Sequence, residues 1–268
     1  MTEADRSERD PATSPTSGGV SDELRQAREA IAAASRIVVL TGAGISTDSG
    51  IPDFRGPNGL WTKNPAAEKA SNITYYLSDP EVRHAAWQNR LTTPAWTAEP
   101  NVGHAAIVEL ERRGRLHALV TQNIDGLHQK AGHDPSNVIE VHGTVWFTRC
   151  WDCDDRRPME QALNRVRAGD TDPSCLECSG ILKSDTISFG QALIPEVIER
   201  AMTVSDECDL LLAVGSTLSV YPVANCVPRA KAGGAHVLIV NGDETNMDRY
   251  ADQVLLGSIG DILPAIVA

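Results

Sequence analysis

The chain has 268 residues and a formal net charge of −12, and this length fits one large domain or a domain with an insertion. The negative charge argues against a protein that coats nucleic acid or an anionic membrane. No apolar stretch approaches the roughly 18 residues that a membrane span needs, and the polar N-terminus lacks the apolar core of a signal peptide. We therefore expect a cytoplasmic protein in which the six cysteines serve a purpose other than disulfides.

The N-terminal part of the chain changes from a polar segment to an apolar strand. Residues 1–20 are rich in Ser, Thr, Asp, Glu and Pro, which predicts a disordered tail. Ser21 can cap a helix that runs to about Ala34. The apolar, β-branched residues 36–41 predict the first buried strand.

A glycine turn, Gly42-Ala43-Gly44, follows this strand directly. Such a turn connects a buried parallel strand to a helix whose free backbone N–H groups can face a phosphate. The dinucleotide fingerprint has a third glycine where this chain has Thr47, and it has an acidic residue further on that this chain lacks. Two interpretations of the turn alone stay open: a tight turn without a ligand, or a nucleotide site that differs from the standard one.

The rest of the chain alternates between helices and strands after one long irregular region. Residues 51–100 hold several prolines and two short helical stretches near 66–77 and 79–92, and a region of this length indicates a functional loop or lid. The alternation that follows predicts a parallel sheet covered on both faces. The expected strands are 116–121, 138–141, 209–214, 236–240 and 253–256, and the expected helices are 101–113, 195–204, 227–232 and 259–267.

Polar residues or glycines follow five of the expected strands, at Gly42, Asn123, His142, Gly215 and Asn241. The carboxyl ends of the strands line the ligand crevice in sheets of this kind. The five strand ends together therefore indicate a ligand site more strongly than any one of them.

Four of the cysteines form two closely spaced pairs, Cys150-x-x-Cys153 and Cys175-x-x-Cys178. Two such knuckles complete a tetrahedral zinc site, and four protein ligands leave no open position for water, so the metal is expected to be structural. A redox pair or unrelated buried thiols are the alternatives. Cys208 and Cys226 stand alone and are interpreted as small buried hydrophobic residues.

Several motifs together resemble the sirtuins, which are NAD-dependent protein lysine deacylases. The resemblance runs in order from about residue 36 to the C-terminus. The motifs that carry it are Gly42-Ala43-Gly44-Ile45-Ser46, Gly50-Ile51-Pro52-Asp53-Phe54-Arg55, Thr121-Gln122-Asn123-Ile124-Asp125, His142-Gly143 and the four paired cysteines.

The resemblance implies an α/β fold with two domains. Residues 21–51, 101–143 and 189–268 are expected to form a Rossmann-like NAD-binding domain, a parallel sheet with helices on both faces. Residues 52–100 supply a cofactor loop and the helical part of a smaller, inserted domain, and residues 144–188 supply its zinc ribbon. The chain departs from the family pattern at Gly215-Ser216-Thr217, where Gly-Thr-Ser is common, and at Gln191, where an acidic residue is usual.

The resemblance also assigns roles in the reaction. His142 is the expected general base, since an imidazole pKa near 6.5 suits proton removal at neutral pH; a structural strand-end histidine is the alternative. Asn123 is expected to fix a water or the ribose, with a turn-forming role as the alternative. His104 is interpreted as a packed structural histidine, and His128 as a support for the loop that follows Asp125.

The other expected NAD contacts come from seven stretches of the chain. They are Gly42, Ala43, Gly44, Ile45, Ser46, Asp53, Phe54, Arg55, Trp61, Gln122, Ile124, Asp125, Gly215, Ser216, Thr217, Asn241, Gly242, Asp243 and Ile259. Within this set, Asp125 is expected near the nicotinamide carboxamide, and an N-cap is its alternative role.

The substrate is expected to be an acyl-lysine peptide that binds as an added strand, a mode that tolerates many sequences. The edges that would hold it are Ile187, Ser188, Phe189, Gly190 and Val220. The branch that prefers acidic acyl groups carries Tyr-x-x-Arg where this chain has Trp87-Gln88-Asn89-Arg90. Arg90 is therefore interpreted as a solvated helix residue, and acetyl or a longer neutral acyl group is favoured.

Three functions remain to be separated. The first is removal of acyl groups, with acetyl favoured, giving nicotinamide and O-acyl-ADP-ribose. The second is transfer of ADP-ribose to protein at the same site. The third is a zinc-ribbon interaction module without catalysis, against which the acidic charge and the long α/β body argue.

Overall fold

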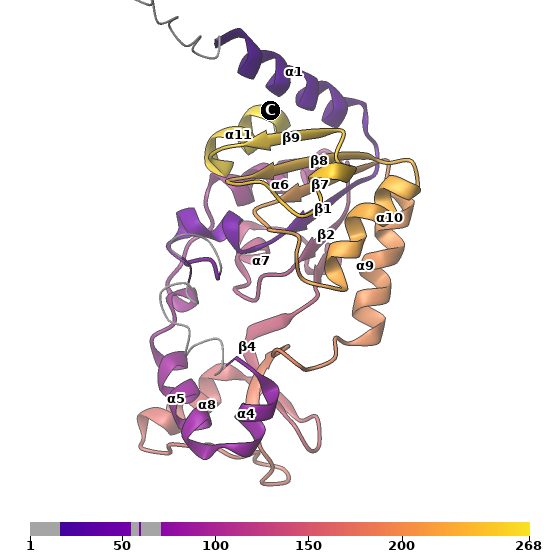
Figure 1. Ribbon diagram of the computed structural model, residues 1–268. Helices are drawn as coiled ribbons and strands as arrows, with labels where there is room; N and C mark the ends of the chain where they lie inside the picture. Colours follow the sequence, from indigo (N-terminus) through magenta and orange to yellow (C-terminus); the bar gives the residue numbers. More distant parts are fainter. Residues whose placement is uncertain (1–16, 55–58, 60–70) are drawn as a thin grey trace, which may run out of the picture.

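The computed structural model describes residues 17–54, 59 and 71–268, which form two parts (Figure 1). One part is built on a six-stranded sheet and the other on a three-stranded sheet. Among the expectations above, those for residues 1–16, Arg55, Trp61 and the start of the helix near 66–77 lie outside the described residues. Within the described ranges, none of the helices combines the length and the hydropathy that crossing a bilayer requires.

The six-stranded sheet is parallel throughout, with the strand order β3-β2-β1-β7-β8-β9. Its strands are β1 Ile37–Thr41, β2 Leu116–Thr121, β3 Val138–Glu140, β7 Leu210–Val214, β8 His236–Asn241 and β9 Gln253–Leu256. The chain moves outward in one direction from β1 to β3 and in the other from β7 to β9. This reversal places a topological switch point between β1 and β7, where sheets of this kind bind ligands.

Helices cover both faces of this sheet, as the alternating pattern predicts (Figure 1). Val39 of β1 packs into one apolar cluster and Val38 into the other, because successive side chains of a strand point to opposite faces. All five residues of β1 are buried, since neither face is left to water. The first cluster involves α1 Ser17–Ala33, α6 Val102–Arg112 and α11 Ile259–Val267, and the second involves α9 Pro195–Glu207 and α10 Cys226–Ala232.

The helix α6 begins where the sequence predicts, at the cap residue Asn101. The Asn101 side chain accepts the backbone N–H of His104, and the His104 ring accepts the backbone N–H of Asn101. This reciprocal pair is a capping box with histidine in the place usually held by Glu or Gln. The remaining short helices are α7 Leu127–Ala131 and the 3-10 turns Ala43–Ser49, Pro94–Trp96, Pro135–Asn137, Val223–Asn225 and Asp248–Tyr250.

The first helix is longer than predicted. It begins at Ser17 and not at Ser21, so residues 17–20 belong to the helix and not to a tail. Ala27 and Ile31 anchor the helix in the core. Once such an anchor exists, each added residue gains one hydrogen bond, and no proline after Pro15 interrupts the extension.

In the second part, the described residues form an antiparallel sheet of order β5-β4-β6 and three α-helices. The strands are β4 Gly143–Cys150, β5 Arg156–Pro158 and β6 Leu182–Thr186, and the helices are α4 Ile73–Ser78, α5 Pro80–Leu91 and α8 Met159–Arg167. Trp87 of α5 is fully buried against Met159 and Leu163 of α8. The helical segment and the cysteine-bearing segment therefore share one small core, although about 60 residues separate them in the sequence.

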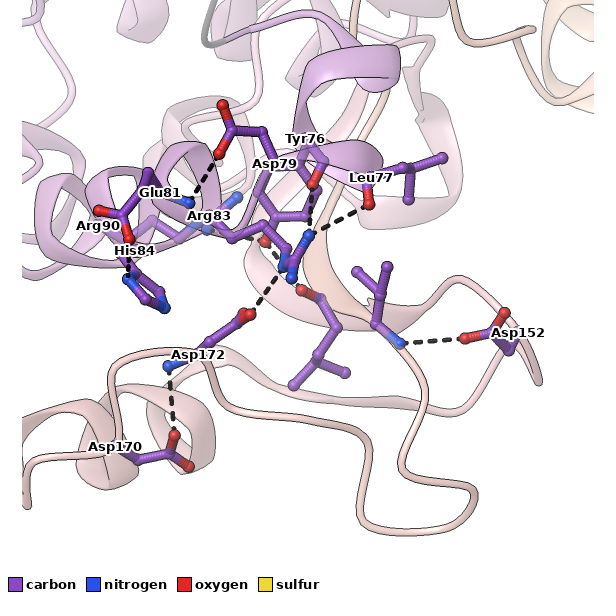
Figure 2. A network of polar contacts seen from close by, with 12 residues as sticks. Tyr76, Leu77, Asp79, Glu81, Arg83, His84, Arg90, Asp152, Asp170 and Asp172 are labelled. Atoms are coloured by element: carbon purple, nitrogen blue, oxygen red, sulfur yellow. Dashed lines mark hydrogen bonds and ion pairs between the residues drawn. The ribbon is translucent and has the colours of Figure 1, made fainter.

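A polar network also ties α4 and α5 to the cysteine-bearing segment (Figure 2). Arg83 of α5 donates to Asp172 at 2.8 Å and to the backbone oxygens of Tyr76 and Leu77. The Tyr76 hydroxyl donates to the backbone oxygen of Leu182 at 2.8 Å. Burial of the Arg83 and Asp172 side chains to 12% and 28% exposure makes this ion pair more than a solvated surface contact.

Candidate active site

The glycine turn after β1 packs directly against the glycine after β7. Gly42 donates its N–H to Val214, and Gly44 donates its N–H to the Gly215 oxygen at 2.8 Å. A Cβ on Gly44 would lie 2.7 Å from the Gly215 α carbon, and Gly215 itself has a φ of +64°. The switch point is thus lined by bare backbone, which allows a ligand to approach closely.

The side chains after β2 bind this turn. Asn123 donates from Nδ2 to the Gly42 oxygen and to the Ser46 Oγ, both at 3.1 Å. Ser46 donates in turn to Asp125 Oδ2 at 2.8 Å. Asp125 is buried, which raises the pKa of its carboxyl, and its other oxygen accepts the N–H of Leu127. The two motifs that the sequence singles out therefore form one hydrogen-bonded unit.

Gln122 extends this unit to the strand end of β7. Its side chain donates to the Ser216 Oγ at 2.9 Å, and the same oxygen accepts the Leu218 N–H. Thr217 is exposed and its hydroxyl bonds to that of Ser219. The Ser216 hydroxyl thus faces the interior of the site, whereas the Thr217 hydroxyl faces the segment that leads to Val220.

His142 stands beside Gln122 in a fixed tautomer. Its Nδ1 lies 3.0 Å from the Gln122 backbone oxygen. A carbonyl oxygen can only accept, so Nδ1 carries the proton and Nε2 is left with its lone pair. Burial lowers the pKa of His142 below 6.5, and the bond to Gln122 opposes that shift only in part. The imidazole is therefore neutral at pH 7, with a basic nitrogen available.

The cysteines Cys150, Cys153, Cys175 and Cys178 converge, as the sequence predicts. Their four sulfur atoms all lie within 4.8 Å of one another, and two of the pairs are 3.5 and 3.7 Å apart. Tetrahedral zinc with Zn–S bonds of about 2.3 Å requires sulfurs about 3.8 Å apart. The four thiolates thus fit a closed, structural zinc ion.

This arrangement is shared with a known protein family. The model of the Sir2 family matches residues 42–222. The chain belongs to the Sir2 family. It is 46% identical to the NAD-dependent protein deacetylase 2 of Streptomyces coelicolor, and the match covers 86% of this chain and 96% of that one.

Solved structures agree with this assignment. A structure solved to explain the mechanism and regulation of Sir2 enzymes has a TM-score of 0.83 and is 38% identical to this chain. The match covers 92% of this chain and 96% of that one. A Sir2 complex with a p53 peptide and NAD+ has a TM-score of 0.80 and 31% identity, with 90% of this chain and 95% of that one covered. The resemblance to sirtuins and the expected fold class are confirmed.

Other expected NAD contacts of this Sir2 chain lie at the ends of β8 and β9. Asn241 is buried and donates from its side chain to the backbone oxygen of Asp243 at 2.7 Å. Gly242 and Asp243 are exposed, and Ile259 is half-buried at the start of α11. Asn241 therefore holds its own turn, and the Asp243 carboxylate faces solvent. Asp53 and Phe54 end the first described stretch, with Phe54 38% exposed.

One of the two expected peptide-binding edges is hydrogen-bonded to His142. Ile187 donates its N–H to the His142 backbone oxygen at 2.8 Å. Phe189 is 40% exposed and pairs through its backbone with Ser71 and Ile73. Ser188 is half-buried and Gly190 is exposed, while Val220 is half-buried on the second edge.

The structure also brings out residues whose contacts the sequence does not reveal. His128 is fully enclosed and bonds through Nε2 to the Thr41 hydroxyl at 2.9 Å. Thr41 bonds to Thr121, whose hydroxyl accepts the backbone N–H of Asn123. His128 thus supports the strand ends beneath the site. The alternation of side chains along each strand cannot show that Thr41 and Thr121 lie side by side at the ends of β1 and β2.

Arg90 is not the solvated helix residue that the sequence suggested. Its guanidinium lies over the Trp87 ring at 4.4 Å and donates to the Tyr76 hydroxyl and the Ser184 hydroxyl, each at 3.3 Å. Figure 2 shows Arg90 together with Tyr76. The guanidinium also lies 5.3 Å from the centroid of the Tyr76 ring. Cation–π attraction to the two rings favours this inward position, because the attraction is stronger where the cation is shielded from water.

Proposed function

We propose that this chain removes acetyl groups from protein lysines with NAD as co-substrate, releasing nicotinamide and O-acetyl-ADP-ribose. The observation that carries the proposal is that Asn123 and Asp125 bond to the glycine turn after β1, while His142 bonds to the neighbouring Gln122. The family membership and the name of the Streptomyces relative support the same reaction. NAD, when bound, supplies an anomeric carbon from which nicotinamide can depart.

The glycine turn is suited to the dinucleotide. Gly42, Gly44 and Gly215 present backbone without side chains at the switch point. Ala43, Ile45, Ser46 and Ser216 line the same edge of the sheet, and in this proposal they contact the cofactor through backbone N–H groups and hydroxyls. The Ile45 side chain packs into the core, so it leaves the backbone of the turn open to a pyrophosphate.

Asn123 and Asp125 hold the nicotinamide riboside end. Both N–H donors of the Asn123 amide are engaged within the protein, so its oxygen remains to accept from a ribose hydroxyl or a water. Asp125 uses one oxygen toward Ser46 and the other toward the Leu127 N–H. A carboxylate oxygen accepts more than one hydrogen bond, and the N–H donors of a carboxamide fit the remaining lone pairs.

His142 acts as the general base. Its protonated Nδ1 is held by the Gln122 oxygen, and Nε2 takes a proton from a ribose hydroxyl once the acyl oxygen has replaced nicotinamide. The same residue holds Ile187 through its backbone oxygen. This second bond links the base to the edge on which the substrate lies.

The peptide is proposed to bind between residues 187–190 and Val220 as an added strand, with its backbone hydrogen-bonded on both sides. In this proposal residues 52–100 and 144–188 form the smaller domain, and the acyl-lysine enters beside it. The zinc ion holds the fold of the cysteine-bearing segment and takes no part in the reaction, because a four-thiolate site leaves no open position. Location in the cytoplasm and the absence of nucleic-acid partners stay predictions.

Incubation of an acetyl-lysine peptide with NAD and the protein tests the proposal by mass spectrometry. We expect the peptide to lose one acetyl group while nicotinamide appears in equal amount. His142→Ala should lower the turnover by about a hundredfold or more, in line with the loss of a general base. His117→Ala, at the surface histidine that pairs with Glu207, is the matched control and should retain wild-type turnover.

Two results would contradict the proposal. An unchanged peptide with a mass gain on protein would indicate transfer of ADP-ribose. Full deacetylation by His142→Ala would show that His142 is not the general base.

A further inference from the structure

Residues 142–146 bond to three backbone carbonyl groups of the turn at residues 122–125. Gln122 O accepts from the His142 ring at 3.0 Å, and Ile124 O accepts from the Val145 N–H at 2.9 Å. The third bond comes from a side chain: Trp146 Nε1 donates to Asp125 O at 2.7 Å. Most of this turn is therefore bound by His142 and the start of β4.

The Trp146 indole fits closely against this turn. Gly126 has a φ of +75°, and a Cβ on it would lie 2.5 Å from Trp146 Nε1. The ring thus occupies the space that any other residue at position 126 would need. Trp146 is nevertheless 38% exposed, so its place is not explained by burial of apolar surface alone.

A second tryptophan fixes the ring from the other side. The rings of Trp96 and Trp146 meet edge to face, with centroids 5.0 Å apart and an interplanar angle of 73°. Trp96 donates its own Nε1 to the Arg90 backbone oxygen at 2.6 Å. Edge-to-face pairs add about 0.5–1.5 kcal/mol beyond area burial. The Trp146 ring is thereby anchored to the segment that follows α5 while its N–H faces the turn.

We infer that Trp146 is a positioning residue for Asp125 and that it sets the affinity of the site for the carboxamide of nicotinamide. Its N–H fixes the peptide plane between Asp125 and Gly126. That plane, together with Gly126, sets where the Leu127 N–H lies relative to the Asp125 carboxylate to which it donates. With the plane held, the carboxylate faces Ser46 and accepts the Leu127 N–H at the same time.

Loss of the Trp146 N–H leaves the Asp125 carbonyl without its donor and allows the plane to rotate. A rotated plane moves the Leu127 N–H away from Asp125 Oδ1, so the carboxylate loses a donor that holds its direction. This weakens nicotinamide binding more than binding of the rest of the dinucleotide. The inference rests on the proposed function, since it assigns Asp125 to that carboxamide.

The test compares three proteins: wild type, Trp146→Phe and a variant with benzothienylalanine at position 146. The last replaces only the indole N–H by sulfur and keeps the ring contact with Trp96. Trp151→Phe is the matched control, because Trp151 is a similarly exposed tryptophan at 43% exposure. The measurements are the inhibition constant of nicotinamide, kcat, KM for NAD and Tm.

We expect the inhibition constant of nicotinamide to rise about tenfold in both position-146 variants, the size of one net hydrogen bond. The kcat should fall, while KM for NAD and, in the benzothienylalanine variant, Tm should change little. An unchanged inhibition constant in that variant overturns the inference, as does a lowered Tm without a change in the constant. If the wild-type protein itself releases no nicotinamide, the proposed function fails before the variants are compared.

Discussion

Replacement of His104 by glutamine is expected to make the stability of the protein less sensitive to acid. His104 has no exposed surface, and its ring accepts the Asn101 N–H, so the proton of the neutral ring lies on Nε2. That atom has no hydrogen-bond partner among the residues that the structure describes. The His128 ring lies 5.0 Å away between centroids. Burial lowers the pKa of His104 from 6.5 to about 4.

The size of the effect follows from the two pKa values. In the unfolded chain His104 takes up a proton as the pH falls through 6.5, whereas in the folded protein it stays neutral until about pH 4. The stabilisation is therefore complete above pH 6.5 and is lost as the pH falls toward the folded pKa. Between about pH 7.5 and about pH 5 the free energy of unfolding should fall by about 2 kcal/mol because of this one residue.

Glutamine is the appropriate replacement because it does not titrate and is a common partner in a capping box. Urea unfolding, followed by circular dichroism, would give the free energy of unfolding of both proteins at the two pH values. His128 and His133 are present in both proteins, so their titration largely cancels in the difference. At neutral pH the variant should be less stable by about 1 kcal/mol through lost packing, and at the lower pH the order should reverse. Equal losses in the two proteins would refute a buried neutral His104.

Two further changes act on the zinc site and the glycine turn. Cys175→Ala removes one of four converging thiolates; we expect the zinc content to fall below one ion per chain and the cysteine-bearing segment to unfold, and full zinc content by metal analysis would contradict this. Gly44→Ala places a Cβ 2.7 Å from the Gly215 α carbon, so the turn must shift. NAD binding by calorimetry should be lost while the circular dichroism spectrum is retained, and wild-type affinity would show that the turn is not the cofactor site.

The local motifs of this chain are readable from sequence because each depends on neighbouring residues. The strand 36–41 and the glycine turn after it appear where the pattern predicts them, as β1 and the turn that packs on β7. The spacing of the cysteine pairs alone predicts the converged sulfurs. The sequence does not predict the start of α1 at Ser17, since the extension of a helix depends on its distant anchor in the core.

The sequence by itself determined which strand ends carry polar residues, the zinc knuckles and the identity of the general base candidate. Only the tertiary structure decided how these groups bond. Asn123 donates both of its amide N–H groups to the Gly42–Ser46 turn, and the Gln122 carbonyl fixes the tautomer of His142. The Trp146 indole donates to the backbone oxygen of Asp125. The physical reason is that these bonds join segments that are distant in the sequence. The strand order brings β1, β2 and β7 together, and the start of β4 lies beside residues 122–125. That arrangement is set by packing over the whole chain, and no local pattern encodes which donor meets which acceptor.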